Sequence, residues 1–330
     1  MDLIDIDSFI DVKPYWLELN RTYKTNELAL DYELYDRLRK LIYQPKNILL
    51  KTYCGFKKHE CIAVFPFKIF PPVMESVPPP SLGEEAIIAR EYFCPPRWLS
   101  NFISCLPLHT ATDMSCFYAP QNTSLFGISA GNIVDIKSTE SEYYYSLTHK
   151  HRHYLQRNYR ENSDITVKSS DLIWSDEIAE LKEKYIQYWT IKNLLRGFSD
   201  QVDSREKIEI DFLLLQRASE MGKLIALYFY YHNRLVAANF SVRREINRVD
   251  DYLCLRDTGE WVAHKSLGVY AILKNIEVCR SFGIRYYDLS DFISDYKRKF
   301  VNTRMVYYYP HPLVTKKTEP DFIIPERVTI

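Results

Sequence analysis

The chain has 330 residues, which is long for one compact domain and comfortable for two. Hydrophobic residues make up 46% and charged residues 26%, a composition that excludes disordered and fibrous classes. Lys plus Arg and Asp plus Glu both number 43, so no overall field favours DNA or an anionic membrane.

The first residues and the cysteines indicate a cytoplasmic protein. The chain begins with the acidic stretch MDLIDID, where a secretory signal would be basic. No apolar run approaches the roughly 20 residues that span a bilayer. The seven cysteines are an odd number without a CxxC pair, which favours buried thiols over disulfides or a zinc site. We therefore expect a cytoplasmic protein without a bound metal.

The first 138 residues predict a mixture of helices and strands. Asn26 is suited to cap a helix that Pro45 stops, and two apolar runs joined by a turn predict a hairpin. The expected elements are a helix at 26–42, hairpin strands at 47–53 and 61–70, a proline-rich loop at 70–80, a helix at 97–106, and strands at 113–118 and 132–136.

From residue 139 the pattern is clearer. Thr139 and Glu142 have the spacing of a capping box, Gly222 ends a helix, and His232-Asn233 forms the turn of a β-meander. The expected elements are a helix at 139–160, a strand at 164–168, helices at 175–190 and 204–221, strands at 223–231, 234–243 and 249–255, a helix at 267–281, and strands at 284–289 and 305–309.

Two compositional features leave alternatives open. The segments 148–160 and 297–304 carry eight Lys or Arg between them, which either face one groove for a nucleotide, phosphosugar or tRNA acceptor end or simply face water. Tyrosine is abundant at 26 residues, with clusters at 143–145 and 307–309. These clusters either stack on bases or pack in the protein, and strand propensity favours packing.

The last elements carry a family resemblance. The helix 267–281 ends at Phe282-Gly283, the strand RYYDLS follows at 285–290, and the basic run YKRKF follows at 296–300. This ordered set resembles the C-terminal half of GNAT-like acyltransferases of the FemAB and CelD-like group. The resemblance covers roughly residues 139–310. It implies a mixed α/β sheet and two tandem GNAT-like units, a degenerate one at 1–138 and a transferase domain at 139–330.

The resemblance also implies a donor site at the start of the helix 267–281. Lys265, Ser266 and Gly268 stand where the family holds phosphate with a cation and helix N–H groups. Tyr270 stands where acetyl-CoA-using relatives have a small residue. This departure favours FemAB-like and CelD-like relatives over standard acetyltransferases.

Acyl transfer to an amine needs a base, and a carboxylate or histidine near the meander tip suits that role. The candidates are Asp257, ranked first, His264 and Asp288; Asp257 alternatively forms only a turn, Asp288 a loop cap, and His264 an exposed loop side chain. By resemblance, Lys297 contacts substrate phosphate, unless it belongs to a solvated loop. Tyr296 packs or donates to the carbonyl oxygen. Arg152 belongs to the Lys/Arg-rich run and is a further candidate for substrate binding.

The sequence therefore predicts an N-acyl or N-aminoacyl transferase. The donor would be acyl-CoA, acyl carrier protein or aminoacyl-tRNA as a co-substrate, with no bound cofactor. The acceptor would be a small-molecule or peptide amine. No Cys–His or Ser–His pair has a diagnostic spacing, so direct attack in a ternary complex is expected. The alternative is a non-catalytic GNAT-like protein that binds a nucleotide or RNA. We expect a monomer or homodimer without DNA as a partner.

Overall fold

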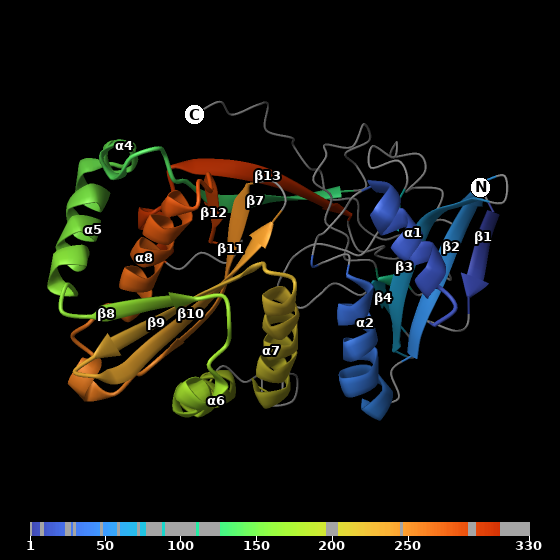
Figure 1. Ribbon diagram of the computed structural model, residues 1–330, viewed down its shortest axis with the longest axis horizontal. Helices are drawn as coiled ribbons and strands as arrows, with labels where there is room; N and C mark the ends of the chain where they lie inside the picture. Colours follow the sequence, from blue (N-terminus) through green and yellow to red (C-terminus); the bar gives the residue numbers. More distant parts are fainter. Residues whose placement is uncertain are drawn as a thin grey trace.

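The computed structural model contains two β-sheets with helices packed against them (Figure 1). It describes residues 2–6, 10–23, 28, 31–46, 49–57, 60–70, 73–76, 88–89, 110–111, 126–195, 204–244, 247–289 and 295–310. Among the helices in these ranges, none is both long enough and apolar enough to cross a lipid bilayer.

The first sheet lies in the N-terminal part and is mostly antiparallel. Its described strands run in the order β1-β2-β3-β4-β6, with β5 beside β3, and only β4 and β6 pair in parallel. The bounds are β1 Asp2–Ile6, β2 Leu49–Lys57, β3 Glu60–Phe70, β4 Val73–Ser76, β5 Ile88–Ala89 and β6 Thr110–Ala111. The helices here are α1, Lys13–Tyr23, and α2, Tyr32–Leu38, which continues as a π-helical turn over Arg39–Tyr43.

Several predictions for this part need correction. The hairpin of β2 and β3 is confirmed, but β1 and α1 were not predicted. The helix expected from residue 26 begins as α2 at Tyr32, because the Asp31 side chain accepts from the backbone N–H of Leu34 at 2.8 Å and caps it. The loop expected at 70–80 contains β4. The predicted helix 97–106 and strand 113–118 lie outside the described residues.

The second sheet positions the candidate site. Its described strands run in the order β13-β7-β12-β11-β10-β9-β8, and all neighbours are antiparallel except β11 and β12. The strands are β7 Phe126–Asp135, β8 Thr166–Ser170, β9 Leu224–Tyr231, β10 Arg234–Arg244, β11 Arg248–Arg256, β12 Tyr286–Asp288 and β13 Thr303–Pro310. The helices are α4 Glu140–Tyr145, α5 His149–Glu161, α6 Ser175–Leu195, α7 Ser204–Glu220 and α8 Leu267–Ser281.

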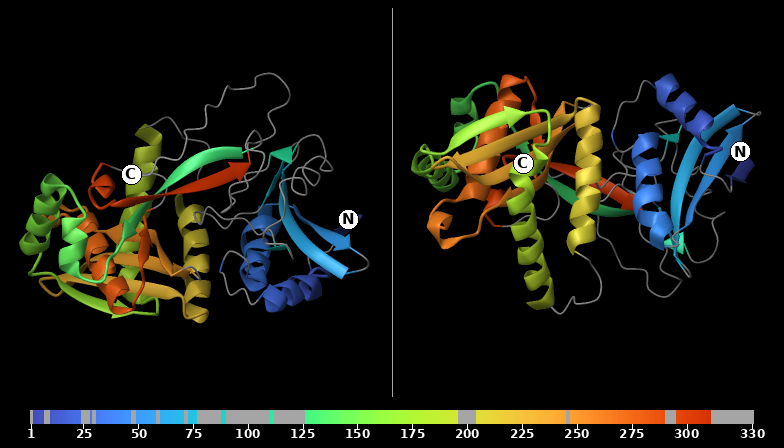
Figure 2. Two further views of the ribbon diagram at one scale, coloured as in Figure 1. Left: turned by 90° about the horizontal axis from the view of Figure 1, so that it is seen from above. Right: turned by 60° about the horizontal axis from the view of Figure 1, so that its bottom comes forward.

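Both faces of the second sheet are covered. The helices α5 and α8 pack on one face, and α6 and α7 pack on the other (Figures 1 and 2). Strand β9 shows the consequence, because its residues from Leu224 to Phe229 are all buried and alternate between the two cores. This strand therefore requires a continuous apolar run in the sequence, because alternating apolar and polar residues would place the polar side chains in one of the two cores.

One of these cores continues into the N-terminal part. Val12, Trp16 and Leu38 belong to the same buried cluster as Leu214 and Phe240. Helix α2 lies beside α7 (Figure 2). The predicted division at residue 138, and the degenerate copy before it, stay predictions. The second sheet takes in β7, which ends at Asp135, ahead of that division.

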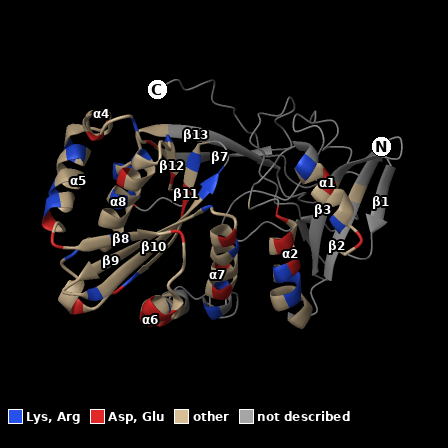
Figure 3. Ribbon diagram, in the orientation of Figure 1, with Lys and Arg blue, Asp and Glu red and all other residues tan. Residues whose placement is uncertain are grey.

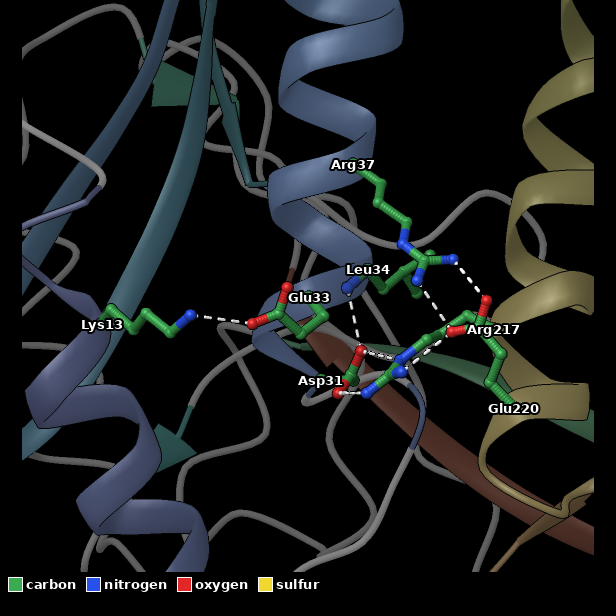
Figure 4. A network of polar contacts seen from close by, with 7 residues as sticks. All are labelled: Lys13, Asp31, Glu33, Leu34, Arg37, Arg217 and Glu220. Atoms are coloured by element: carbon green, nitrogen blue, oxygen red, sulfur yellow. Dashed lines mark hydrogen bonds and ion pairs between the residues drawn. The ribbon is translucent and has the colours of Figure 1, made fainter.

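A network of ion pairs joins α2 to α7 at this junction (Figure 4). The Arg217 guanidinium donates to both carboxylate oxygens of Asp31 at 2.7 and 3.0 Å, and to Glu220 at 3.0 Å. Arg37 donates two hydrogen bonds of 2.8 Å to Glu220. The Asp31 and Glu220 hydrogen bonds raise the pKa of Arg217, although partial burial opposes this. Charged groups thus fix the spacing of the two helices.

The helix expected at 139–160 is two helices. The capping box of Thr139 and Glu142 is confirmed and begins α4. Ser146 ends α4 by donating from its hydroxyl to the Tyr143 carbonyl at 2.6 Å, and Thr148 caps α5. Tyr143 and Tyr144 are buried in the core, which confirms packing rather than base stacking for these two, although they lie on a helix and not in a sheet.

Candidate active site

The parallel strands β11 and β12 open a space in the second sheet. In the described residues, the pairing between β11 and β12 involves only Arg248, Val249 and Asp250 of β11. Beyond Asp250, residues of β11 line a pocket of about 230 Å³, which we call the inner pocket. Its walls come from α6, β10, β11, α8 and the segment after β12: Tyr185, Tyr188, Trp189, Asn239, Asp251, Tyr252, Leu253, Cys254, Arg256, Thr258, Gly268, Ile272, Tyr296 and Lys297.

A second pocket of about 340 Å³ lies beside the start of α8, and we call it the helix pocket. It is lined by Arg256, Asp257, Thr258, Val262, Ala263, Lys265, Ser266, Leu267, Gly268, Val269 and Tyr296. The two pockets share Arg256, Thr258, Gly268 and Tyr296. Because four residues face both spaces, the two pockets adjoin, and we call the pair the cleft.

Gly268 keeps the shared wall open. A Cβ atom at this position would lie 3.0 Å from the Arg256 Nη1 atom and 3.6 Å from the Tyr296 hydroxyl oxygen. The first backbone N–H groups of an α-helix have no partner within the helix, and the Ser266 side chain does not cap α8. The glycine therefore leaves space beside the first turn of α8, where the helix dipole attracts negative charge.

Lys297 is held at the inner pocket by a buried carboxylate. Its ammonium donates to Asp251 Oδ2 at 2.9 Å and to the Leu289 carbonyl at 3.3 Å, and the Asp251 side chain is 8% exposed. Burial opposes both charges, but their attraction outweighs it. The pKa of the Asp251 carboxyl is lowered, and the pKa of the Lys297 ammonium is raised. The inner pocket therefore contains a fixed positive charge.

Two other neighbours of Lys297, the Tyr296 phenol and the Cys254 thiol, are uncharged near neutral pH. Tyr296 is half-buried, and burial raises the pKa of its phenol. Burial, followed by the charge of Asp251, raises the pKa of the Cys254 thiol to about 11, so the thiol is protonated near neutral pH. A protonated thiol is a weak nucleophile. The geometry accordingly agrees with direct attack better than with acylation of Cys254.

Asp257 lines the helix pocket with both carboxylate oxygens in use. Oδ2 accepts from the Lys184 ammonium at 2.8 Å, and Oδ1 accepts from the Gly259 N–H at 2.8 Å. Burial raises the pKa of Asp257, but these two hydrogen bonds outweigh it and lower the pKa overall. Residues 257–259 form no assigned backbone turn, and the hydrogen bond from the Gly259 N–H to the Asp257 side chain is the local contact here. Each carboxylate oxygen can accept two hydrogen bonds, so Asp257 can act as a base without losing either partner.

The predicted donor residues Lys265, Ser266 and Gly268 all line the helix pocket. Lys265 is already paired, because its ammonium contacts both oxygens of Asp164 at 2.8 and 2.9 Å. Tyr270 points into the core, where it is 2% exposed and lies edge-on to Phe229. The large side chain that replaces a small residue therefore does not fill the helix pocket.

Three predicted site residues are not among those that line either pocket. His264 is exposed beside the Tyr231 ring. Asp288 is buried at the end of β12, with its carboxylate 3.9 Å from the Arg248 guanidinium. The Arg152 guanidinium lies 4.7 Å from the centre of the Tyr145 ring on the side of α4 and α5. The structure thus brings together Asp257, Lys265, Ser266, Gly268, Tyr296 and Lys297 but leaves these three apart.

The two basic segments are neighbours. Lys299 lies 3.6 Å from the centre of the Tyr154 ring on α5, along which basic residues recur (Figure 3). Lys297, two residues earlier, faces the inner pocket instead. The groove common to both segments therefore stays a prediction, although their proximity agrees with it.

Sequence reasoning missed Asp251 and the aromatic wall of the inner pocket. Asp251 is a carboxylate in a partly buried strand, which is a detectable signal, but its partner Lys297 is 46 residues away in sequence. Tyr185, Tyr188 and Trp189 have helical spacing and lie on one side of α6. Within the described residues, no group of three or more His, Cys, Asp or Glu could hold a metal ion.

Known structures share this architecture. FemX aligns with a TM-score of 0.54 and 9% identity over 94% of this chain and 97% of that chain. The chain has a GNAT-like fold. The C-terminal domain of a protein described as a lysylphosphatidylglycerol synthetase, from Agrobacterium fabrum, aligns with a TM-score of 0.53 and 9% identity over 92% and 91% of the two chains. A Bacteroides thetaiotaomicron protein of unknown function aligns with a TM-score of 0.53 and 13% identity over 94% of this chain and 100% of that chain.

At these identities the likeness establishes the fold alone. It confirms the expected GNAT-like architecture and the expected likeness to the FemAB group at the level of the fold. No protein-family model matches the chain, and no curated protein sequence matches it.

Proposed function

We propose that this protein is an acyltransferase that moves an acyl or aminoacyl group from an activated donor to an amine. The observation that carries the proposal is that a pocket at the α8 N-terminus adjoins the pocket at the Lys297 ammonium. The two share Arg256, Thr258, Gly268 and Tyr296. One end of the cleft suits an anionic carrier, and the other suits a carbonyl group that gains negative charge during transfer.

The donor carrier occupies the helix pocket. Its phosphate accepts hydrogen bonds from the first N–H groups of α8, close to Gly268, and Arg256 adds positive charge at the shared wall. Tyr270 does not obstruct this site because it lies in the core. CoA thioesters, acyl carrier protein and aminoacyl-tRNA all have phosphate groups on the carrier that bears the reactive carbonyl.

The carbonyl carbon is attacked in the inner pocket. The amine nitrogen forms a bond to the carbonyl carbon while negative charge develops on the carbonyl oxygen, and the bond to the sulfur or oxygen of the carrier then breaks. Lys297 and the Tyr296 hydroxyl supply donors to the developing oxyanion. The amine loses a proton to a base, and the leaving group takes up a proton.

Asp257 is the predicted base that lines the cleft. Proton transfer to it uses a lone pair other than those that accept from Lys184 and Gly259. The lowered pKa makes this carboxylate a weak acceptor, so the acceptor amine would have to enter largely in its neutral form. A rate that rises with pH as the acceptor amine loses its proton would agree with this proposal.

The acceptor is a small-molecule or peptide amine that enters the inner pocket past Tyr185, Tyr188 and Trp189. The aromatic side chains offer apolar faces to the carbon skeleton of a substrate. We keep the cytoplasmic location and the monomeric or homodimeric state as predictions, because they rest on the sequence.

Donor binding tests the proposal directly. Calorimetry with acetyl-CoA, and filter binding with charged and uncharged tRNA at low and moderate salt, should show saturable binding of one donor class. Gly268→Val should abolish it by filling the shared wall, whereas Ser281→Val, which places the same side chain at the exposed C-terminal end of α8, should not. Transfer of a radiolabelled acyl group to a panel of amines then reports the reaction.

The outcomes separate the candidate functions. Binding of a donor with transfer supports the enzyme, and the donor bound identifies the carrier. Binding of tRNA or nucleotide without transfer to any amine would instead support the non-catalytic alternative. Donor binding unaffected by Gly268→Val would contradict the placement of the carrier at α8.

A further inference from the structure

A connected set of buried polar side chains lies beneath the inner pocket. Asp251 Oδ2 accepts from Lys297, while Asp251 Oδ1 accepts from the Tyr287 hydroxyl at 2.9 Å and from the Asn239 amide at 3.1 Å. Asn275 donates to Asn239 at 2.7 Å, and the Ser241 hydroxyl lies 3.2 Å from Asn239, Asn275 and Tyr287. These residues come from β10, β11, β12, α8 and the segment after β12.

The burial of this set requires an explanation. Asn239, Ser241, Asn275 and Tyr287 are each at most 1% exposed, and polar groups in such positions are costly unless every one is hydrogen-bonded. An apolar cluster would fill the same space without the free-energy cost of desolvating polar groups. The set instead holds the Asp251 carboxylate in place through Oδ1, and Oδ2 accepts from Lys297 at the pocket wall.

We propose that Asp251 is a positioning residue for acyl transfer, which holds the Lys297 ammonium at the inner pocket so that it faces the developing oxyanion. The inference rests on the proposed function. An ammonium has three N–H donors, and Asp251 and the Leu289 carbonyl accept two of them. Among the described residues no further group accepts from the third N–H, so this donor can reach a substrate oxygen.

Asp251 acts through Lys297 and not on the substrate proton. Both of its oxygens already accept hydrogen bonds from Lys297, Tyr287 and Asn239, and its side chain is almost fully enclosed. A base would need an exposed lone pair. Tyr287 and Asn239 prevent the carboxylate from rotating, so that the position of Lys297 follows from the sheet rather than from the loop that carries it.

The decisive experiment compares Asp251→Asn with the wild type in two readouts. Competitive labelling with acetic anhydride across pH 7 to 11, followed by peptide mass spectrometry, measures the neutral-amine fraction of Lys297. Each unit by which the Lys297 pKa falls raises that fraction about tenfold. Steady-state transfer kinetics with the donor found by binding measure kcat and KM separately.

We expect Asp251→Asn to raise the labelling of Lys297 near pH 9 by about tenfold or more. The same variant should lower kcat by about 10²-fold with little change in the KM for the donor. Asp251→Glu, which retains the negative charge, should recover protection from labelling and part of kcat. Ser241→Ala removes a hydroxyl of the same buried set that does not contact Asp251, and it should leave Lys297 protected.

Two results would overturn the proposal. If Asp251→Asn leaves the labelling profile of Lys297 unchanged, Asp251 does not hold the ammonium. If labelling rises but kcat is unchanged, the ion pair exists without serving transfer. A wild type that transfers no acyl group would refute the proposed function, while the labelling comparison would still decide whether Asp251 controls Lys297. The two failures are therefore distinguishable.

Discussion

The ion pair between Asp31 and Arg217 should contribute measurably to the stability of the junction between α2 and α7. Asp31→Asn removes the charge but keeps a side chain that caps α2 well. Arg217→Met removes the guanidinium and keeps most of the apolar stem, while Glu220 retains its two hydrogen bonds to Arg37. The double variant completes a cycle that isolates the pair.

The magnitude follows from the geometry. Arg217 donates to both oxygens of Asp31 at 2.7 and 3.0 Å, and the two side chains are 21% and 13% exposed. Hydrogen bonds between charged groups contribute roughly 1.5–3 kcal/mol, and partial exposure reduces this value. We therefore expect a coupling free energy of about 2 kcal/mol.

Urea unfolding followed by tryptophan fluorescence measures the cycle, because Trp16 and Trp174 lie in or against the core that spans the junction. The matched control is Arg205 with Glu183, which also has two hydrogen bonds but is about half exposed. Its coupling should be much smaller, since solvent screens it. A coupling at Asp31 and Arg217 no larger than that of the control would refute the reasoning.

Three further predictions concern buried polar contacts. Lys184→Met should lower the free energy of unfolding by about 3 kcal/mol in urea titrations, because it leaves the 2% exposed Asp257 carboxylate without its main partner. The pKa of Asp257 is lowered on folding, so the ionised carboxylate stabilises the folded state. The difference in unfolding free energy between wild type and Asp257→Asn should therefore have its full value above about pH 4 and shrink as pH falls through the folded pKa. An unchanged difference between pH 7 and pH 3 would contradict this. Tyr228→Phe should cost about 1–3 kcal/mol in the same assay, since its hydroxyl accepts from the Trp174 N–H and donates to the Leu172 carbonyl.

The elements that the sequence predicts best are those with local signals. The helix predicted at 267–281 matches α8 at both ends. Gly283 adopts a φ of +70° just after the last turn and ends the helix. His232 and Asn233 both have positive φ in the tight turn between β9 and β10. In each case a few neighbouring residues determine the backbone, so one sequence window contains the information.

The elements that it missed depend on distant contacts. The start of α2 at Asp31 is reinforced by Arg217, which lies 186 residues later. The strand β4 forms in a segment flanked by prolines because β3 is available to pair with it. No property of residues 70–80 alone indicates that partner.

The same distinction applies to the cleft. Lys297 and Gly268 could be identified because the motifs around them have a recognisable order. Asp251 could not, because its role depends on the separation of β11 from β12 beyond Asp250 and on the return of the chain at Lys297. A carboxylate in a strand becomes informative only when the partner across the sheet is known.

Strand β7 has a consequence for how the chain reaches its native state during synthesis. It is made early, but it pairs with β12 and β13, and Asp135 meets Asn302 across 167 residues. The ribosome must deliver nearly the whole second sheet before β7 finds its neighbours. Until then its hydrogen-bonding edges are open, so nascent chains that stall before β13 should depend on chaperones more than released ones do.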